Sequence, residues 1–124
     1  MVLRSSGLVE DIHRDWSAVG VKFAVVGTGS VAGAGNADLV AAVSGKRIRV
    51  LHLYVVPTAS STMTLRSGTT AITGAMSTAA GVSIDASHSE GLAVLQTAAG
   101  EALNLLNGGT SCAFAGFLVY AEVN

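Results

Sequence analysis

The sequence predicts an all-β protein, an antiparallel, jelly-roll-like β-sandwich with a short N-terminal arm. Three observations lead to this prediction. Short runs of alternating apolar and polar residues recur along the chain, with turn signals between them at intervals of about eight to twelve residues. The chain contains 15 glycines and one proline, a composition that suits many tight turns. Half of its 124 residues are apolar, which is enough for one domain with its own core.

Residues 1–17 differ from the rest of the chain and are expected to form an arm outside the β-sandwich domain, which spans residues 18–124. The arm holds five of the fifteen charged residues. Leu8, Ile12 and Trp16 lie four residues apart, a spacing that places them on one face of a short helix. One or two turns of helix are marginal alone in water, so we expect these three residues to bind a partner.

The clearest strand is expected at residues 46–56. One of its faces carries Ile48, Val50, His52, Tyr54 and Val56, and the other carries Arg47, Arg49, Leu51, Leu53 and Val55. The second face begins charged and becomes apolar, so we expect its far half to be covered on both sides. An earlier strand is expected at residues 19–25, where Val21, Phe23 and Val25 alternate with smaller or polar residues. It should end in a glycine-rich loop at residues 27–36.

The second half of the chain is also predicted to form short strands. Residues 62–66 alternate, and the turn signal Ser67-Gly68 predicts a hairpin partner at residues 69–73. Residues 92–97 and 101–106 are predicted as two strands rather than one helix, because Gly100 in the middle of a helix would cost about 1 kcal/mol. The last strand, residues 111–123, has Phe114, Leu118 and Tyr120 on one face and Phe117, Val119 and Val123 on the other.

The low charge argues against several classes of partner. Only 12% of residues are charged and the net charge is −1, so no general attraction to nucleic acid or to an anionic membrane is expected. No apolar run approaches the roughly 18–20 residues that span a bilayer. Cys112 is the only cysteine and is expected to be a small buried residue. We expect a surface that other protein subunits partly cover.

One glycine-rich segment resembles a dinucleotide-binding loop, but it lacks the rest of that site. The stretch from Gly27 to Gly33 has its third glycine one residue late, and no amphipathic helix follows it. About twenty residues on, where the ribose needs an acid, the sequence has Lys46 and Arg47. We therefore expect a loop and no bound cofactor.

Residues 85–90 contain the residue types of a hydrolase, but their arrangement does not predict one. Asp85, Ser87 and His88 are neighbours in one expected polar loop, whereas a catalytic triad needs side chains that converge from separate elements. His13, His52 and His88 show no metal-ligand spacing. His52 is expected to be a hydrogen-bonded histidine in the core or at an interface. The sequence therefore predicts no enzyme activity and no metal.

Four segments, at residues 45–50, 64–76, 97–105 and 116–123, resemble the small virion proteins of tailed bacteriophages. The shared features are the Gly-Lys-Arg-Ile-Arg-Val strand, the Ser-Gly-Thr-Thr turn, the Gly-Glu-Ala-Leu-Asn-Leu strand and the closing Tyr-Ala-Glu-Val. The resemblance covers about residues 45–124 and not the arm. It implies a jelly-roll-like sandwich, often a trimer, on the head surface or in the tail, without catalytic residues.

The resemblance and the low charge together lead us to expect a capsid decoration, or cement, protein. It would sit on the capsid surface of the virion, after synthesis in the bacterial host cytoplasm, and bind the major capsid protein as a homotrimer. The arm residues Leu8, Ile12 and Trp16 are the expected anchors. Residues expected at interfaces between subunits are Arg47, Arg49, Leu51, Leu53 and Arg66. The alternative is a tail, baseplate or fibre component that binds host-surface carbohydrate.

Overall fold

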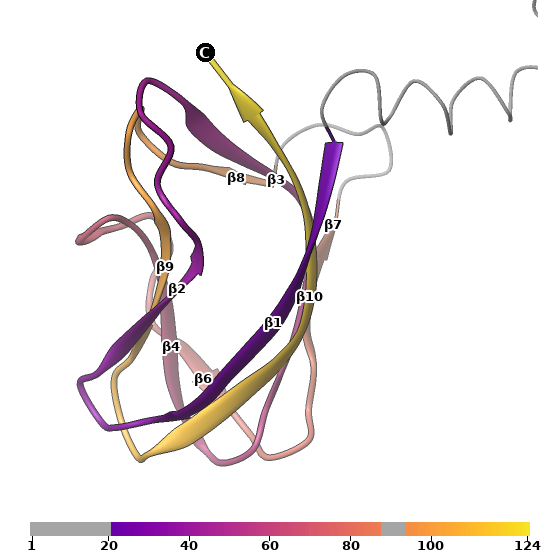
Figure 1. Ribbon diagram of the computed structural model, residues 1–124. Coiled ribbons are helices and arrows are strands. Elements are labelled where there is room, and N and C mark those ends of the chain that lie inside the picture. The colour runs from indigo at the N-terminus through magenta and orange to yellow at the C-terminus, as the bar shows by residue number, and fades with distance from the viewer. Residues whose placement is uncertain (1–20, 88–93) are drawn as a thin grey trace, which may run out of the picture.

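The computed structural model describes residues 21–87 and 94–124, which form ten strands and no helix. The strands make two antiparallel sheets that pack against each other (Figure 1), so the predicted all-β sandwich is confirmed. The first sheet has the order β1-β10-β3-β7, and β8 pairs with β3 beyond the end of β7. The second sheet has the order β2-β9-β4-β5, and β6 also pairs with β4.

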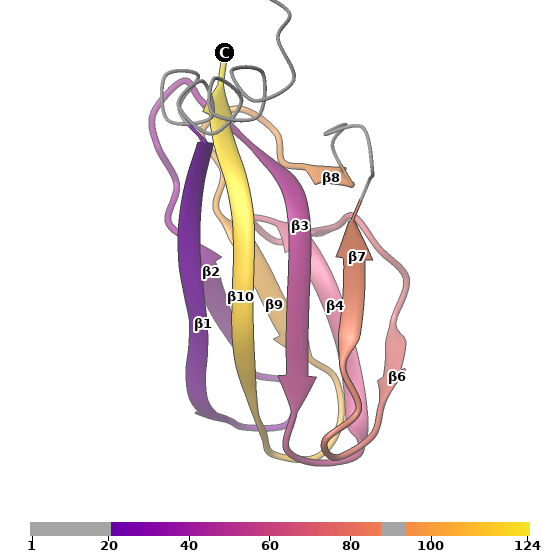
Figure 2. The same ribbon diagram turned by 90° about the vertical axis from the view of Figure 1, so that its right-hand side faces the viewer.

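Each sheet combines strands from both halves of the chain. The first sheet, which faces the viewer in Figure 2, contains β1 (Val21–Val31), β3 (Arg47–Pro57), β7 (Ile84–Ser87), β8 (Leu95–Gln96) and β10 (Cys112–Val123). The second contains β2 (Asn36–Val40), β4 (Ser61–Ser67), β5 (Thr70–Ala71), β6 (Met76–Thr78) and β9 (Leu103–Asn107). Strand β1 lies at one edge of the first sheet, next to β10.

The core lies between the two sheets and is built from aliphatic side chains with one aromatic ring. Its members are at most 7% exposed: Val26, Val31, Val40, Ile48, Val50, Leu53, Val55, Met63, Leu65, Leu103, Leu105, Cys112, Phe114 and Leu118. Burying such side chains is the main favourable term for a domain of this size. Cys112 is 2% exposed, which confirms it as a small buried residue.

Two turn predictions are confirmed by the backbone. Strands β4 and β5 form the expected hairpin, with Ser67 opposite Thr70 and a positive φ of 57° at Gly68. Strands β8 and β9 are separate, as predicted, because the chain turns between them at Gly100, whose φ is 76°. A positive φ costs glycine little, whereas it would end a helix.

The expected alternation of β3 is wrong beyond Val50, because the strand contains a β-bulge. Val50 pairs with Tyr120 of β10 and His52 pairs with Val119, so Leu51 is the extra residue between two consecutive partners. A bulge reverses which side chains face the core. Leu53 therefore lies inside the sandwich at 1% exposure, which corrects its expected place at a subunit interface. Leu51 is half-buried.

The first strand also differs from the prediction. Strand β1 continues to Val31 through an irregularity between Gly27 and Ser30, so the expected loop begins five residues late, after Val31. Val26 faces the core at 3% exposure, whereas Phe23 is 65% exposed on the outer face. The large apolar residues that predicted this strand, such as Phe23 and Val25, thus lie on its outer face. Similarly, Asp85 belongs to β7 rather than to a polar loop.

Candidate interaction surface

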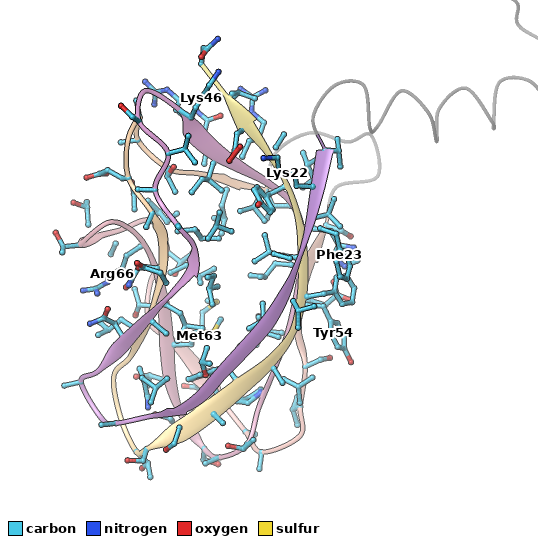
Figure 3. All side chains as sticks on the ribbon, viewed as in Figure 1. Lys22, Phe23, Lys46, Tyr54, Met63 and Arg66 are labelled. Atoms are coloured by element: carbon cyan, nitrogen blue, oxygen red, sulfur yellow. The ribbon has the colours of Figure 1, made fainter. Side chains whose placement is uncertain are left out.

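Three aromatic rings form a row across the outer face of the first sheet. Phe23 of β1 stacks on Phe117 of β10 with ring centroids 5.6 Å apart and an angle of 16° between the rings. Phe117 in turn stacks on Tyr54 of β3, at 5.5 Å and 19°. Figure 3 shows Phe23 and Tyr54 pointing away from the sandwich on the same side. We call Phe23, Phe117 and Tyr54 the aromatic row.

The strand register places these rings together. Phe117 pairs directly with Tyr54 on one side and with Val25 on the other. Phe23 pairs with Val119, so its contact with Phe117 is a diagonal one, to the residue two places before its direct partner. Side chains on one face of antiparallel strands interact both directly and diagonally. The row is therefore a property of the register and not of a loop.

A polar pair ends the row on the side of β7. The Nε2 atom of His52 lies 2.9 Å from Oδ1 of Asp85, and the side chains are 36% and 53% exposed. The His52 ring also meets the Phe117 ring edge-on, with centroids 5.2 Å apart at 72°. His52 is thus a hydrogen-bonded histidine on the outer face of the first sheet, not in the core.

The β1 side of this face is the most exposed apolar part of the described surface. Phe23 is 65% exposed and Val25 is 75% exposed. The outward-facing residues of β10 beside them, Phe117 and Val119, are half-buried and also apolar. Single exposed apolar residues are ordinary on protein surfaces, but adjoining ones that include stacked aromatic rings are typical of an interaction site.

The predicted arginines do not gather in one place. Arg47 and Arg49 lie on β3 of the first sheet, and Nε of Arg49 donates to Oε1 of Gln96 at 2.9 Å. Arg66 lies on β4, on the outer side of the second sheet, away from Phe23 in Figure 3. Its Nε and one terminal nitrogen donate to Oδ1 of Asn104 at 2.9 and 2.7 Å. The three arginines thus occupy opposite faces of the sandwich.

Arg66 belongs to a polar network across three strands of the second sheet. Asn104 of β9 accepts the two bonds from Arg66 and donates through Nδ2 to Oδ1 of Asp38 at 2.8 Å and to Oδ1 of Asn36 at 2.9 Å. Asn104 is 3% exposed, so its amide is satisfied entirely within the protein. Arg66 thus has hydrogen-bond partners within its own chain, and its expected place at a subunit interface stays a prediction.

Several predicted residues lie outside the described part of the chain. They are Leu8, Ile12 and Trp16 of the arm, together with His13 and His88. In residues 21–87 and 94–124, no three His, Cys, Asp or Glu side chains group as metal ligands would. The same residues contain no helix of the length and apolarity that a membrane span requires.

Comparison with family models, curated proteins and solved structures finds no match to this chain. The aromatic row is the candidate surface that sequence reasoning missed, although a signal for it was present. Both faces of the last strand are apolar, with Phe117 and Val119 opposite in direction to Phe114 and Leu118. A strand that is apolar on both faces predicts cover on both sides. Only the register shows that Phe23 and Tyr54 join Phe117.

Proposed function

We propose that the protein is a structural subunit of a tailed-bacteriophage particle, a capsid decoration protein that binds the major capsid shell. The observation that carries the proposal is the aromatic row, because it is a stacked and partly uncovered apolar surface on the outer face of a sheet. Buried aromatic side chains supply a large share of the binding energy at protein interfaces.

The charge distribution supports an assembly role. Fifteen charges in 124 residues leave a sparsely charged surface, and the side chain of Phe23 stands in water at 65% exposure. Leaving such a ring exposed forgoes about 1.5–3 kcal/mol of burial free energy. That cost is recovered when a partner covers the face. A decoration protein is covered in this way once it sits on a shell.

The resemblance of residues 45–124 to small virion proteins supports the placement in a phage particle. Two of the segments that carry it are strands of the first sheet, the start of β3 and the end of β10. The second sheet contributes the Ser67-Gly68 turn and β9. The four segments thus come from both layers of one sandwich.

The arrangement of the rings favours a protein partner over a carbohydrate. A sugar stacks on an aromatic ring whose face is open to solvent. Phe117 has Phe23 and Tyr54 stacked against it, with near-parallel planes and centroids 5.6 and 5.5 Å away, within the range of offset stacking. The central ring, Phe117, is therefore covered by a neighbouring ring on each side, whereas Phe23 at the end of the row stays 65% exposed. The tail component that binds carbohydrate becomes an alternative outcome of the experiment below.

The decisive experiment uses phage particles from which the gene has been deleted. Purified wild-type chain is added back, and bound protein is measured by co-sedimentation and located by electron cryo-microscopy. We expect density on the head and a higher temperature of DNA release. Density on the tail instead would favour the alternative, a tail component. If mass spectrometry did not detect the chain in wild-type particles, the proposal would be overturned.

Two variants test whether the face of the first sheet makes the contact. Tyr54→Ser removes a ring of the aromatic row and should weaken binding to particles at least about tenfold. Val82→Ser is the matched control, because Val82 is 59% exposed and lies outside the row. Equal binding by the two variants would show that the shell contacts another surface, such as the arm residues Leu8, Ile12 and Trp16.

A further inference from the structure

We infer that two copies of the chain pair edge to edge through β1, as antiparallel strands related by a two-fold axis at Ala24. The inference deepens the proposed function, on which it rests, by naming a second copy as one partner of the assembly subunit. Strand β1 is eleven residues long and, among the described residues, pairs only with β10. In residues 21–87 and 94–124 no strand covers its other edge, whose backbone groups a second strand can bind.

Strand β1 has few of the features that protect an edge from such pairing, and its one irregularity lies beyond residue 27, between Gly27 and Ser30. It contains no proline, and Lys22 is its one charged residue. The amine of Lys22 is held by its own chain, 2.6 Å from Oε1 of Glu122. In the inferred register Lys22 lies opposite Val26 of the second copy, so no two like charges face each other.

The length of the regular part of β1 selects the register. Residues 21–27 pair with β10 without interruption, and the register shifts only between Gly27 and Ser30. Ala24 is the middle residue of this stretch. A two-fold axis at Ala24 therefore pairs the whole regular stretch with itself, from Val21 opposite Gly27 to Gly27 opposite Val21. Any other symmetric register uses less of it.

The same register covers the two most exposed apolar residues of the sheet. Phe23 falls directly opposite Val25 of the second copy, and Val25 falls opposite Phe23. Both side chains stand on the outer face, at 65% and 75% exposure in the single chain. A contact made by the same patch on both copies is what a two-fold axis requires.

Pairing at Ala24 also extends the aromatic row by repeating its geometry. Phe117 lies two places before Val119, the direct partner of Phe23, and the two rings stack. His52 lies two places before Tyr54, the direct partner of Phe117, and the rings of His52 and Phe117 meet edge-on. In the pair, Phe23 of the second copy lies two places before Val25, the direct partner of Phe23. The two rows then meet as one row of six rings.

The first test is the mass of the full-length chain by sedimentation equilibrium over a wide range of micromolar concentrations. We expect twice the monomer mass of 12.4 kDa. Phe23→Lys should raise the dissociation constant at least about tenfold, whereas the matched control Val82→Ser should leave it unchanged. Thermal unfolding by circular dichroism confirms that both variants fold, which is expected since both residues are exposed.

The second test separates pairing at the edge from packing of one face on another. In the edge-paired dimer, the β1 amides that do not face β10 are protected from hydrogen exchange, and Phe23→Lys removes that protection while β3 and β10 keep theirs. Unchanged β1 exchange in a dimer would overturn the inference, as would a monomer or the trimer that the family resemblance implies. Those results would leave particle binding, and with it the proposed function, unaffected.

Discussion

Lys22 of β1 and Glu122 of β10 form an ion pair across the first sheet, with Nζ and Oε1 2.6 Å apart. The hydrogen bond to Glu122, and then the negative charge of its carboxylate, raise the pKa of Lys22 above its ordinary value of 10.5. The Lys22 side chain is 49% exposed, so solvent screens the pair and its contribution to stability is small.

The raised pKa of Lys22 predicts a specific loss of stability at alkaline pH. A lysine whose folded pKa lies above its unfolded pKa stabilises the fold fully below 10.5, and the contribution is lost as pH rises through the folded value. We expect the melting temperature of wild type to exceed that of Lys22→Met at neutral pH, with the difference shrinking above pH 10.5.

Lys46→Met serves as the control for the alkaline titration. The amine of Lys46 donates to Oδ1 of Asn124, an uncharged amide, at 2.7 Å. Wild type and the two variants have all their other titrating groups in common. A pH-dependent difference in melting temperature that occurs only with Lys22→Met therefore comes from the ion pair. A difference between wild type and Lys22→Met that stays constant across this pH range would contradict the assignment.

Gly116 is required where β10 passes β3 beneath the aromatic row. Its φ is 150°, which side chains rarely adopt, and a Cβ at this position would overlap the carbonyl oxygen of Tyr54. Gly116→Ala must push the two strands apart, so we expect a loss of about 3 kcal/mol or more in the free energy of unfolding by urea. The control Gly27→Ala meets nothing within 4 Å and should cost about 1 kcal/mol at most.

The bulge in β3 predicts that two neighbouring leucines differ in their effect on stability. Leu53→Ala empties a site that is 1% exposed and should lower the free energy of unfolding by about 2–5 kcal/mol. Leu51 is half-buried, so Leu51→Ala should cost less than about 1.5 kcal/mol. Equal losses in chemical denaturation would mean that β3 alternates without a bulge.

The same leucines show how far sequence reasoning reaches. Alternation and turn residues predicted the sandwich, the hairpin at Gly68 and the separation of β8 from β9, because those features depend on local backbone preference. The bulge at Leu51 depends on the pairing of β3 with β10, more than fifty residues away in the chain. A change of register leaves no mark in the alternation of a strand that is apolar on both faces.

The candidate surface was beyond sequence reasoning for a similar reason. Phe23, Tyr54 and Phe117 come from three strands, and only their register brings the rings together. Phe23 sits in an alternating run that indicates a strand but does not say which face is inside. The small residue Ala24 and the larger Val26 pack on the core instead. Hydrophobic size alone therefore points to the wrong face of β1.

Asn107 forms hydrogen bonds with three segments at the end of the sandwich where β1 ends. It is 0% exposed, accepts a hydrogen bond from Oγ of Ser61 at 2.5 Å, and donates to the carbonyl oxygens of Val31 and Thr110 at 2.8 Å each. Asn107→Ala removes all three hydrogen bonds, of which the bond to the Val31 carbonyl is buried, and an unsatisfied buried group costs about 1–3 kcal/mol. We expect the free energy of unfolding to fall by at least about 2 kcal/mol.

The exposed amide of Asn124 provides the comparison for Asn107. Asn124→Ala removes a surface hydrogen bond with Lys46 and should change stability by less than about 0.5 kcal/mol. Hydrogen exchange adds a local readout, since the end of β1 and the start of β10 should open more often in Asn107→Ala. If Asn107→Ala matched Asn124→Ala in urea unfolding, the three segments would be held by packing of Val31 and Cys112 and not by this amide.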